Sequence, residues 1–457
     1  MNELAFHSLH ELIDLLQKKD CSSVDITRVF LDRIDQFDHL HAFIHVDAAA
    51  ALRDAAASDQ RRRDGRLLGP LDGVPFALKD SSEISGQVVS NGSASRLSEV
   101  CSGTASIVKV LRGAGAVLLG RTHMVEFAFG GWGTNPLLGA PWNPWDLSCH
   151  RVPGGSSSGS AVAVAAALAP VAIGTDTGGS IRNPAALCGV TGLKTTVGLI
   201  SAEGIFPLSP TFDSVGPLTR DAYDAALMCG VMSAGRARMD ADPFRSDLRG
   251  VKIATFPEHD LPSELNAEVY AAYSDAIRVL RTSGATLCEI ALPFNIKDLI
   301  FYNARIISAE AWEIHKKVVL DEARPVGDAV RTRIKLGATI SQQEYRDALA
   351  QHHAMKQAWF ETMNGIDAMV MPTVPIYACP IDSVDETATH TAYFNRIANH
   401  VGGCALSVPA GFSGTGMPIG VQFVGKPFDE ATVIRIGAAF QVETDWHRRH
   451  PQLLSKA

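Results

Sequence analysis

The sequence predicts an α/β fold built as a single large domain. Short apolar strands alternate with segments of helical periodicity along most of the 457 residues, which is the order typical of α/β proteins. The chain is 46% hydrophobic, and this fraction can fill a large core. The length would allow about three domains of ~150 residues. However, no repeat, low-complexity tract or Gly/Ser-rich linker divides the chain, and the later strands have no obvious core of their own.

The first 60 residues are expected to be helical. Apolar side chains at helical spacing predict a helix over 24–37, with Ser22 or Ser23 as its N-cap, and a run of alanines predicts a second helix over 47–59. Beyond them the expected elements are strand 71–80, helix 105–112, strand 116–119 closed by Gly120, helix 160–169, strand 171–174, strand 251–254, helix 264–281, strand 285–290, a more charged helical region over 296–362, strands 369–373, 405–409 and 419–424, and helix 430–444.

Charge and hydropathy exclude several classes of partner. The chain has 41 Lys and Arg against 49 Asp and Glu, a net charge of −8, which argues against nucleic acid. The only basic run, 61–63, is expected at a solvated helix end or loop. The longest apolar run, 161–173, is interrupted by Pro170 and is shorter than the ~18–20 residues that span a bilayer. Residues 1–16 lack the pattern of a signal peptide, so the sequence predicts a soluble, cytoplasmic protein without a membrane partner.

Neither a metal nor a cofactor is predicted. The eight cysteines form no CxxC pair and have no metal-ligand spacing, so we expect reduced, mostly buried thiols. His123 and Glu126 could share a helix face, but no further ligand is suitably spaced. His150 lies close to a serine-rich loop, and we expect it either to be structural or to line a pocket.

Residues 154–198 differ in composition from the rest of the chain. Their 45 positions contain 9 Gly and 10 Ser or Thr but only three charged residues, Asp176, Arg182 and Lys194. The helix expected at 160–169 has no polar face and is therefore predicted to be buried. Gly178 and Gly179 predict a turn whose backbone can approach a partner closely.

Three chemistries could use this segment. The first is a Ser-His-Asp hydrolase, because GSSSG at 155–159 matches the GxSxG nucleophile elbow. That elbow needs a strand directly before it, but here a proline, Pro153, and no apolar run come before the motif. A phosphate-binding loop is disfavoured because the chain has no GxxxxGK[ST] motif and no GxGxxG following a strand here. The third chemistry combines this segment with an upstream lysine and rests on a family resemblance.

Three separated pieces carry that resemblance: GVPFALKD at 73–80, GGSSSGS at 154–160 and GTDTGGSIR at 174–182. Together they closely resemble the amidase signature family of serine hydrolases. The likeness continues through 184–194 and 213–217, includes 143–145 and 417–422, and covers nearly the whole chain, weakest at 235–395. It implies one amidase domain over 1–457 with a central mixed β-sheet flanked by many α-helices. The implied layout is N-terminal helices at 1–60, a catalytic core at 65–230, a variable substrate-pocket region at 235–395 and a C-terminal return to the sheet at 396–457.

The resemblance implies a Ser–cis-Ser–Lys triad, with Ser180 as nucleophile, Ser156 as the relay after a cis peptide bond, and Lys79 as base. The chemistry agrees, because a serine hydroxyl needs a base and a lysine becomes one only where burial lowers its pKa. Lys79 ends an apolar strand, which favours burial. Its neighbour Asp80 would oppose the lowered pKa, so we predict that Asp80 points elsewhere.

The resemblance also implies an oxyanion hole formed by the amides of Thr177, Gly178, Gly179 and Ser180. Asp176 and Arg182 are lone charges in an apolar segment and are predicted to pair if they are buried. The segment 124–133 resembles the part of the family that borders the substrate channel, and 296–395 resembles the variable region over the pocket. The candidate pocket residues are Met124, Phe127, Phe129, Trp132, Tyr302, Ile306, Ile307 and Trp312.

The leading functional hypothesis is an amidase, an amidohydrolase that cleaves a linear C–N bond other than a peptide bond in a small apolar or aryl substrate. An acyl-enzyme would form on Ser180. Because the resemblance includes enzymes that cleave carbamates, acyl ureas and aryl acylamides, these substrates stay open. A further alternative is the glutaminase component of a tRNA-dependent amidotransferase, whose glutamine-holding aspartate would fall at Ala392. The expected partners are a small amide or carbamate and water, and a homodimer is one candidate assembly.

Overall fold

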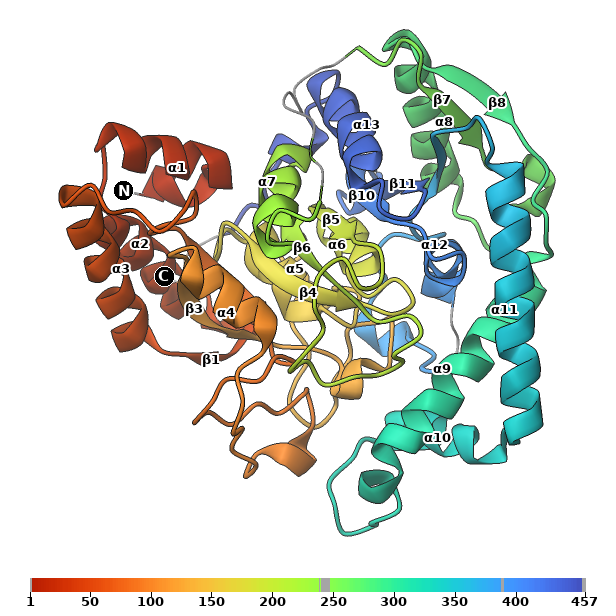
Figure 1. The fold of residues 1–457 in the computed structure, drawn as a ribbon, viewed down its shortest axis with the longest axis horizontal. Helices are drawn as coiled ribbons and strands as arrows, with labels where there is room; N and C mark the ends of the chain where they lie inside the picture. Colours follow the sequence, from red (N-terminus) through yellow and green to blue (C-terminus); the bar gives the residue numbers. More distant parts are fainter. Residues whose placement is uncertain (1, 238, 240–246, 388–389, 454–457) are drawn as a thin grey trace.

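The computed structural model describes residues 2–237, 239, 247–387 and 390–453, and one β-sheet crosses them (Figure 1). Its strands are β1 (Phe43–Val46), β2 (Pro75–Lys79), β3 (Val117–Thr122), β4 (Ala172–Asp176), β5 (Thr191–Lys194), β6 (Ser214–Thr219), β7 (Lys252–Thr255), β8 (Thr286–Glu289), β9 (Ala368–Pro372), β10 (Ala405–Phe412) and β11 (Pro418–Gly425).

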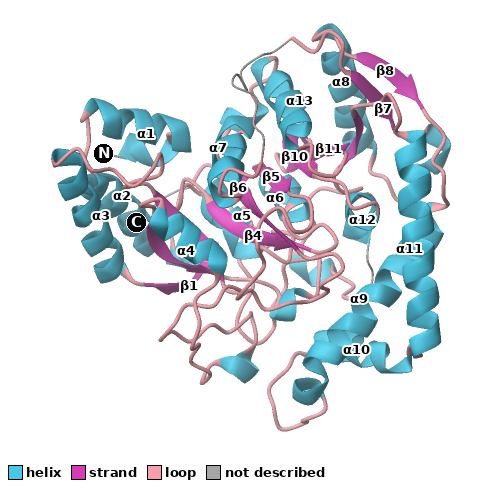
Figure 2. Cartoon of the chain, viewed as in Figure 1, coloured by secondary structure: helices cyan, strands magenta, loops and turns pink. Residues whose placement is uncertain are grey.

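The helices of the described residues surround this sheet, as Figure 2 shows in cyan around the magenta strands. They are α1 (Leu9–Lys18), α2 (Ser23–Gln36), α3 (Ala48–Arg63), α4 (Ser106–Gly113), α5 (Ser158–Ala165), α6 (Arg182–Cys188), α7 (Ala222–Met232), α8 (Ala267–Thr282), α9 (Ile296–Val319), α10 (Asp328–Leu336), α11 (Gln342–Thr362), α12 (Asn395–His400) and α13 (Glu430–Val442). No helix of the described part is long and apolar enough to cross a membrane.

The sheet is continuous and mixed, which confirms the fold class expected from the sequence. Its strand order is β1-β3-β2-β4-β6-β5-β10-β11-β9-β7-β8. The edge strand β1 pairs antiparallel with β3, and β3, β2 and β4 are parallel. Strands β9, β7 and β8 are parallel at the other end, and the strands between these two groups pair antiparallel. The later strands therefore extend the sheet that holds the early ones, and the described residues form a single domain.

Helices cover both faces of this sheet. A Cβ atom on Gly420 of β11 would lie 2.7 Å from Ala186 Cβ of α6, whereas one on Gly425 would lie 2.7 Å from Val433 Cγ1 of α13. Residues five apart in a strand point to opposite faces, so α6 and α13 lie on opposite sides. Helices α9, α10 and α11 extend along one side of the molecule, at the right in Figure 1.

Gly120 does not end a strand, in contrast to the sequence prediction. Strand β3 does not close at Gly120 but continues to Thr122. A Cβ atom there would lie 2.2 Å from His45 O, so glycine lets β1 approach the strand closely. Strand β1 also interrupts the region 1–60 that was predicted to be wholly helical, because its pairing with β3 is a long-range contact.

The other N-terminal predictions are close to the structure. Ser22 is the N-cap of α2 and accepts a hydrogen bond from the Asp25 amide. Helix α3 runs past the expected end to Arg63, so the basic run lies in its last turn. Arg61 is not simply solvated there, since its Nη2 forms a 2.6 Å ion pair with the buried Asp72.

The sheet topology brings the segments with the predicted catalytic residues together. β2 and β4 are parallel neighbours, with Leu78 opposite Ile173, so their C-terminal ends lie at the same edge. Lys79 ends β2, and the segment after β4 leads into the turn with Ser180. Helix α5 is buried along its whole length between these elements, as its lack of a polar face predicted.

Candidate active site

Two serine loops lie against each other at the ends of β2 and β4. The first precedes α5 and contains a cis peptide bond between Gly155 and Ser156, as the family resemblance implied. The second carries Ser180. The Ser157 amide donates to Ser180 O (3.1 Å), and Ser157 Oγ lies 3.3 Å from both the N and the O of Thr175. These bonds hold Ser156 and Ser180 in adjacent backbone segments.

Lys79 lies beneath the first loop with its amine in a buried polar contact. Its Nζ hydrogen-bonds Ser156 Oγ (2.7 Å) and Thr175 Oγ1 (2.7 Å), and the residue is only 1% exposed. Burial lowers the pKa of Lys79 to about 7, although the charges of Asp176 and Asp213 oppose this shift. A substantial part of Lys79 is therefore neutral near pH 7, which is the state that a general base needs.

Asp80 points away from this lysine, as predicted. Its Oδ1 accepts a 2.5 Å bond from Arg121 Nη1, and its Oδ2 accepts from the amide and hydroxyl of Ser90. The carboxylate of Asp80 is thus paired with Arg121 and makes no hydrogen bond to Lys79.

Asp176 and Arg182 form the buried pair that the sequence predicted. Both side chains are fully buried, and Arg182 Nη2 lies 3.0 Å from Asp176 Oδ1. Burial by itself would raise the pKa of Asp176, but Arg182 holds it well below its usual range. Arg182 also donates to Asn399 Oδ1 (2.6 Å) and Gln422 Oε1 (2.8 Å). This network joins the serine turn to α12 and β11.

The turn before Ser180 leaves three of the four predicted oxyanion amides available. Gly179 has φ 118°, and a Cβ atom there would lie 2.5 Å from Asn395 Cβ, so only glycine fits. Its amide donates to Asp176 Oδ1 (2.8 Å) and is thus already used. Among the described residues no acceptor is found for the amides of Thr177, Gly178 and Ser180.

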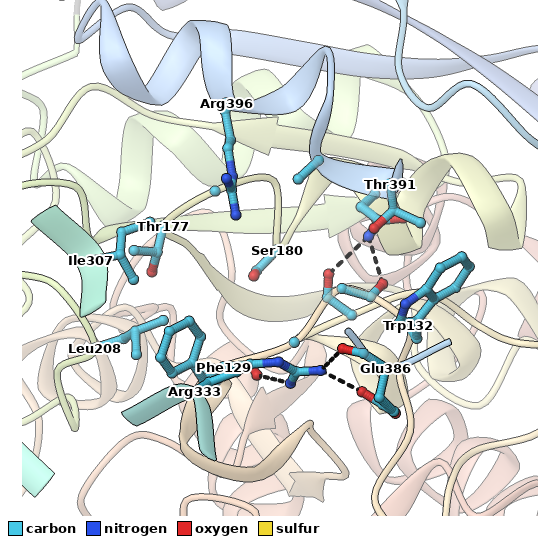
Figure 3. Close-up of a pocket in the computed structure, with 17 residues that line it drawn as sticks. Phe129, Trp132, Thr177, Ser180, Leu208, Ile307, Arg333, Glu386, Thr391 and Arg396 are labelled. Atoms are coloured by element: carbon cyan, nitrogen blue, oxygen red, sulfur yellow. Dashed lines mark hydrogen bonds and ion pairs between the residues drawn. The ribbon is translucent and has the colours of Figure 1, made fainter. Parts of the chain in front are cut away.

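A small cavity of about 90 Å³ opens onto Ser180 (Figure 3). Ser180 and Gly155 both line it, so both serine loops reach its wall. The apolar part of the wall includes Phe129, Leu208 and Ile307. The cavity therefore combines a serine hydroxyl, open backbone amides and an apolar surface, which suits a small substrate.

Comparisons with known proteins agree with this geometry. A sequence model of the family described as Amidase matches residues 25–434. The chain belongs to the amidase family. It is 35% identical to the A component of the glutamyl-tRNA(Gln) amidotransferase of Chloroflexus aggregans, with 99% of each chain covered. Peptide amidase from Stenotrophomonas maltophilia has a TM-score of 0.83 at 30% identity, covering 97% of this chain and 98% of its own. The corresponding amidotransferase component from Thermotoga maritima has a TM-score of 0.82 at 28% identity, with 99% of each chain covered.

The predicted pocket residues of this amidase-family chain fall into two groups. Phe129, Trp132 and Ile307 line the cavity. The structure places Met124, Phe127 and Ile306 behind its wall, where they pack in one buried cluster with Leu208 and Ile307, and Tyr302 and Trp312 pack against that cluster. Phe127 is held there by its ring, which stacks on His315 at 4.6 Å. The sequence prediction therefore located the wall but did not separate its inner surface from the packing behind it.

Three charged side chains of the cavity were missed in the sequence. They are Arg333 of α10, Glu386 and Arg396 of α12. Arg333 donates to Phe129 O (2.6 Å) and Glu386 Oε2 (2.6 Å), and it thereby bridges two sides of the cavity (Figure 3). Only Arg396 had a local signal, since it is the sole Lys or Arg within the otherwise uncharged segment 391–400.

The histidines noted in the sequence lie outside this cavity. His150 stacks on Trp142 with ring centroids 4.2 Å apart, which favours the structural one of the two roles considered for it. His123 is buried, and burial lowers its pKa to about 4.

Among the described residues, one group offers three atoms of the kinds that bind metals, namely His10, Asp221 and Asp224. Asp224 there already accepts bonds from the amides that begin α1.

Proposed function

We propose that this chain is an amidase that hydrolyses the C–N bond of a small amide through an acyl-enzyme on Ser180. The observation that carries the proposal is the buried 2.7 Å contact between Lys79 Nζ and Ser156 Oγ, in the loop packed against Ser180. A neutral Lys79 can accept a proton from Ser156, which in turn accepts one from Ser180. The family membership supports these assignments, and the open amides of the 177–180 turn would stabilise the oxyanion.

The proposed reaction has two halves. Ser180 Oγ attacks the carbonyl carbon while its proton passes through Ser156 to Lys79. The C–N bond then breaks, and the proton is delivered to the leaving nitrogen, which departs as ammonia or an amine. In the second half water loses a proton to the same relay, attacks the acyl carbon and releases the acid with Ser180 restored. Carbamates and acyl ureas could react by the same steps.

A second candidate is the glutaminase component of an amidotransferase, and the names of the curated relatives favour it. Two features of the cavity favour a stand-alone amidase instead. Ala392 lines it at the position where the resemblance would require the glutamine-holding aspartate. The one described carboxylate in its lining, Glu386, is already paired with Arg333, so no acid remains for the ammonium group of glutamine.

The test is a hydrolysis screen of the purified chain across primary amides, anilides, carbamates, acyl ureas and glutamine. An amidase should turn over at least one non-glutamine substrate without any other protein. Hydrolysis of glutamine alone, and only with the other amidotransferase components added, would support the second candidate. The screen with and without these components also tests whether the chain needs protein partners, and a mass measurement in solution tests the homodimer considered from the sequence. A cytoplasmic location stays a prediction of the sequence.

The matched control is Ser180→Ala. It should lower the rate by about 10⁴-fold or more, because the acyl-enzyme is proposed to form on the Ser180 hydroxyl. The fold should persist, since the change removes one hydroxyl at the cavity surface. Normal turnover by this variant would contradict the assignment of Ser180 as nucleophile.

A further inference from the structure

Arg396 brings a guanidinium group to the wall of the catalytic cavity. It projects from α12 toward the space in front of Ser180 (Figure 3). A Cβ atom on Gly178 would lie 3.9 Å from Arg396 Cγ and 4.0 Å from its Nε. The side chain therefore flanks the turn that would hold the oxyanion.

This guanidinium has few partners of its own. Among the described residues it makes a single hydrogen bond, from Nη1 to Ile300 O at 3.4 Å, and its buried Nε has no acceptor. Burial lowers the pKa of Arg396 to about 10, so the group is still charged at neutral pH. By contrast, Arg182 uses Nε, Nη1 and Nη2 in bonds to acceptors.

The charges in the cavity lining leave Arg396 uncompensated. The described lining contains two arginines and one acid. That acid, Glu386, accepts bonds from Arg333 and from Thr134, so Arg396 is the positive charge without a partner. A desolvated charge is costly unless an opposite charge or several hydrogen bonds accompany it, and an anionic ligand would supply both.

We propose that Arg396 binds a carboxylate of the substrate, so that the preferred substrate is a small amide that also carries a carboxylate. A guanidinium presents parallel N–H donors that match the two oxygens of a carboxylate. The apolar wall of Phe129, Leu208 and Ile307 would contact a hydrocarbon segment between the two groups. This inference rests on the proposed amidase function and adds the substrate class.

The first experiment compares matched substrates. Succinamic acid carries a carboxylate next to the amide on the acyl side, N-acetylglycine carries it on the leaving-group side, and succinamide and N-acetylglycinamide are their neutral counterparts. The wild type should prefer one of the acids by about tenfold to a hundredfold in kcat/KM, the range expected for a hydrogen-bonded charge. The acid that is preferred identifies the side of the scissile bond that faces Arg396. Equal rates for both acids and their neutral counterparts would overturn the proposal.

The second experiment changes the arginine. Arg396→Met should reduce the preference for the acid to within about threefold, whereas Arg396→Lys should keep part of it because its charge remains. Arg435→Met is the matched control: this arginine lies on α13, outside the cavity lining, and bonds Asp247 O. It should leave the preference unchanged. An unaltered preference in Arg396→Met, folded by circular dichroism, would also overturn the proposal. If Arg396→Met does not fold, the folded Arg396→Lys variant tests the proposal instead. A full wild-type preference for the acid in Arg396→Lys would contradict paired binding of the carboxylate by the guanidinium.

A binding measurement separates this inference from the proposed function. Calorimetric titration of Ser180→Ala should show that it binds the preferred acid about tenfold or more tightly than its neutral counterpart. The difference should vanish in the Ser180→Ala, Arg396→Met double variant. Arginine-dependent binding without wild-type hydrolysis of any amide would reject the proposed function and keep the carboxylate site. Hydrolysis of amides without a carboxylate effect would do the reverse.

Discussion

The cavity is built from two regions that differ in their burial. On one side lies segment 154–198, called the serine segment below, where all residues are buried except Gly178, Val197 and Gly198. On the other lie the helices of 296–400, many of whose residues are half-buried or exposed. The charges of the first region have partners inside it or on β11 and α12, as in Asp176 with Arg182. Of the second region's charges that line the cavity, Arg333 and Glu386 pair with each other, whereas Arg396 has almost no partner.

We expect this difference in burial to separate the residues that set the reaction rate from those that select the substrate. Lys79 of β2 bonds Ser156 and Thr175 of the serine segment, and burial there lowers its pKa to about 7. Close backbone approach at Gly179 shapes the turn of the same segment, so the proposed chemistry depends on tight packing. The helical side contributes side chains such as Ile307, Arg333 and Arg396 to the cavity wall. Substitutions in the first region should therefore affect kcat and folding, and those in the second should mainly affect KM and substrate preference.

The largest effect in this comparison is expected from Lys79→Met. It should lower kcat/KM by about 10²- to 10⁴-fold at neutral pH, the range for loss of a general base. In the wild type the rate should rise with pH around a midpoint near 7, because only the neutral amine accepts the proton. Asp213→Asn should move this midpoint to lower pH, since the charge of Asp213 raises the pKa of Lys79. A mild loss in Lys79→Met would point to another base.

The same variant should change how stability depends on pH. The unfolded chain keeps a proton on Lys79 up to its ordinary pKa of 10.5, while the folded chain keeps it only below about 7. Because the unfolded state binds more protons between these values, the free energy of unfolding rises with pH across that window. Lys79→Met should remove this contribution, which denaturant titrations at several pH values would measure.

An intermediate effect, on folding, is expected from Asp176→Asn. Arg182 would lose its counter-charge in a fully buried site, at a cost of about 3–5 kcal/mol in the free energy of unfolding. The control is Asp275→Asn, in an exposed pair with Arg278, where the loss should be under about 1 kcal/mol. Urea denaturation of both variants gives the comparison. Similar losses for the two variants would mean that burial does not distinguish the serine segment.

The smallest effect is expected from Arg333→Met on the helical side. Its bonds to Phe129 O and Glu386 would be lost, so KM should rise about three- to tenfold while kcat changes by less than about twofold, as for interactions made equally in the ground and transition states. Lys335→Met on the same helix removes only an exposed pair with Glu322 and should leave both constants unchanged. If Arg333→Met lost as much kcat as Lys79→Met, the two regions would not differ in the way expected.

Much of the fold could be predicted from the sequence, because most strands and helices have local periodicity. Strands β9, β10 and β11 and helices α2, α8 and α13 lie close to their predicted ranges. Strands β5 and β6 were missed, since their residues acquire a strand conformation by pairing with distant segments. The same reason explains Gly120, which looked like a strand end but accommodates β1.

The sequence by itself determined the α/β class and proposed the catalytic groups Lys79, Ser156 and Ser180, because each lies in a short contiguous motif. Only the tertiary structure decided how these groups are surrounded. It directed the Gly179 amide to Asp176, turned Asp80 toward Arg121 and placed Arg396 beside Gly178. These outcomes depend on contacts between segments up to 218 positions apart (178 to 396). Local periodicity and motif spacing carry no information on such distances, whereas burial and charge pairing in the folded chain do.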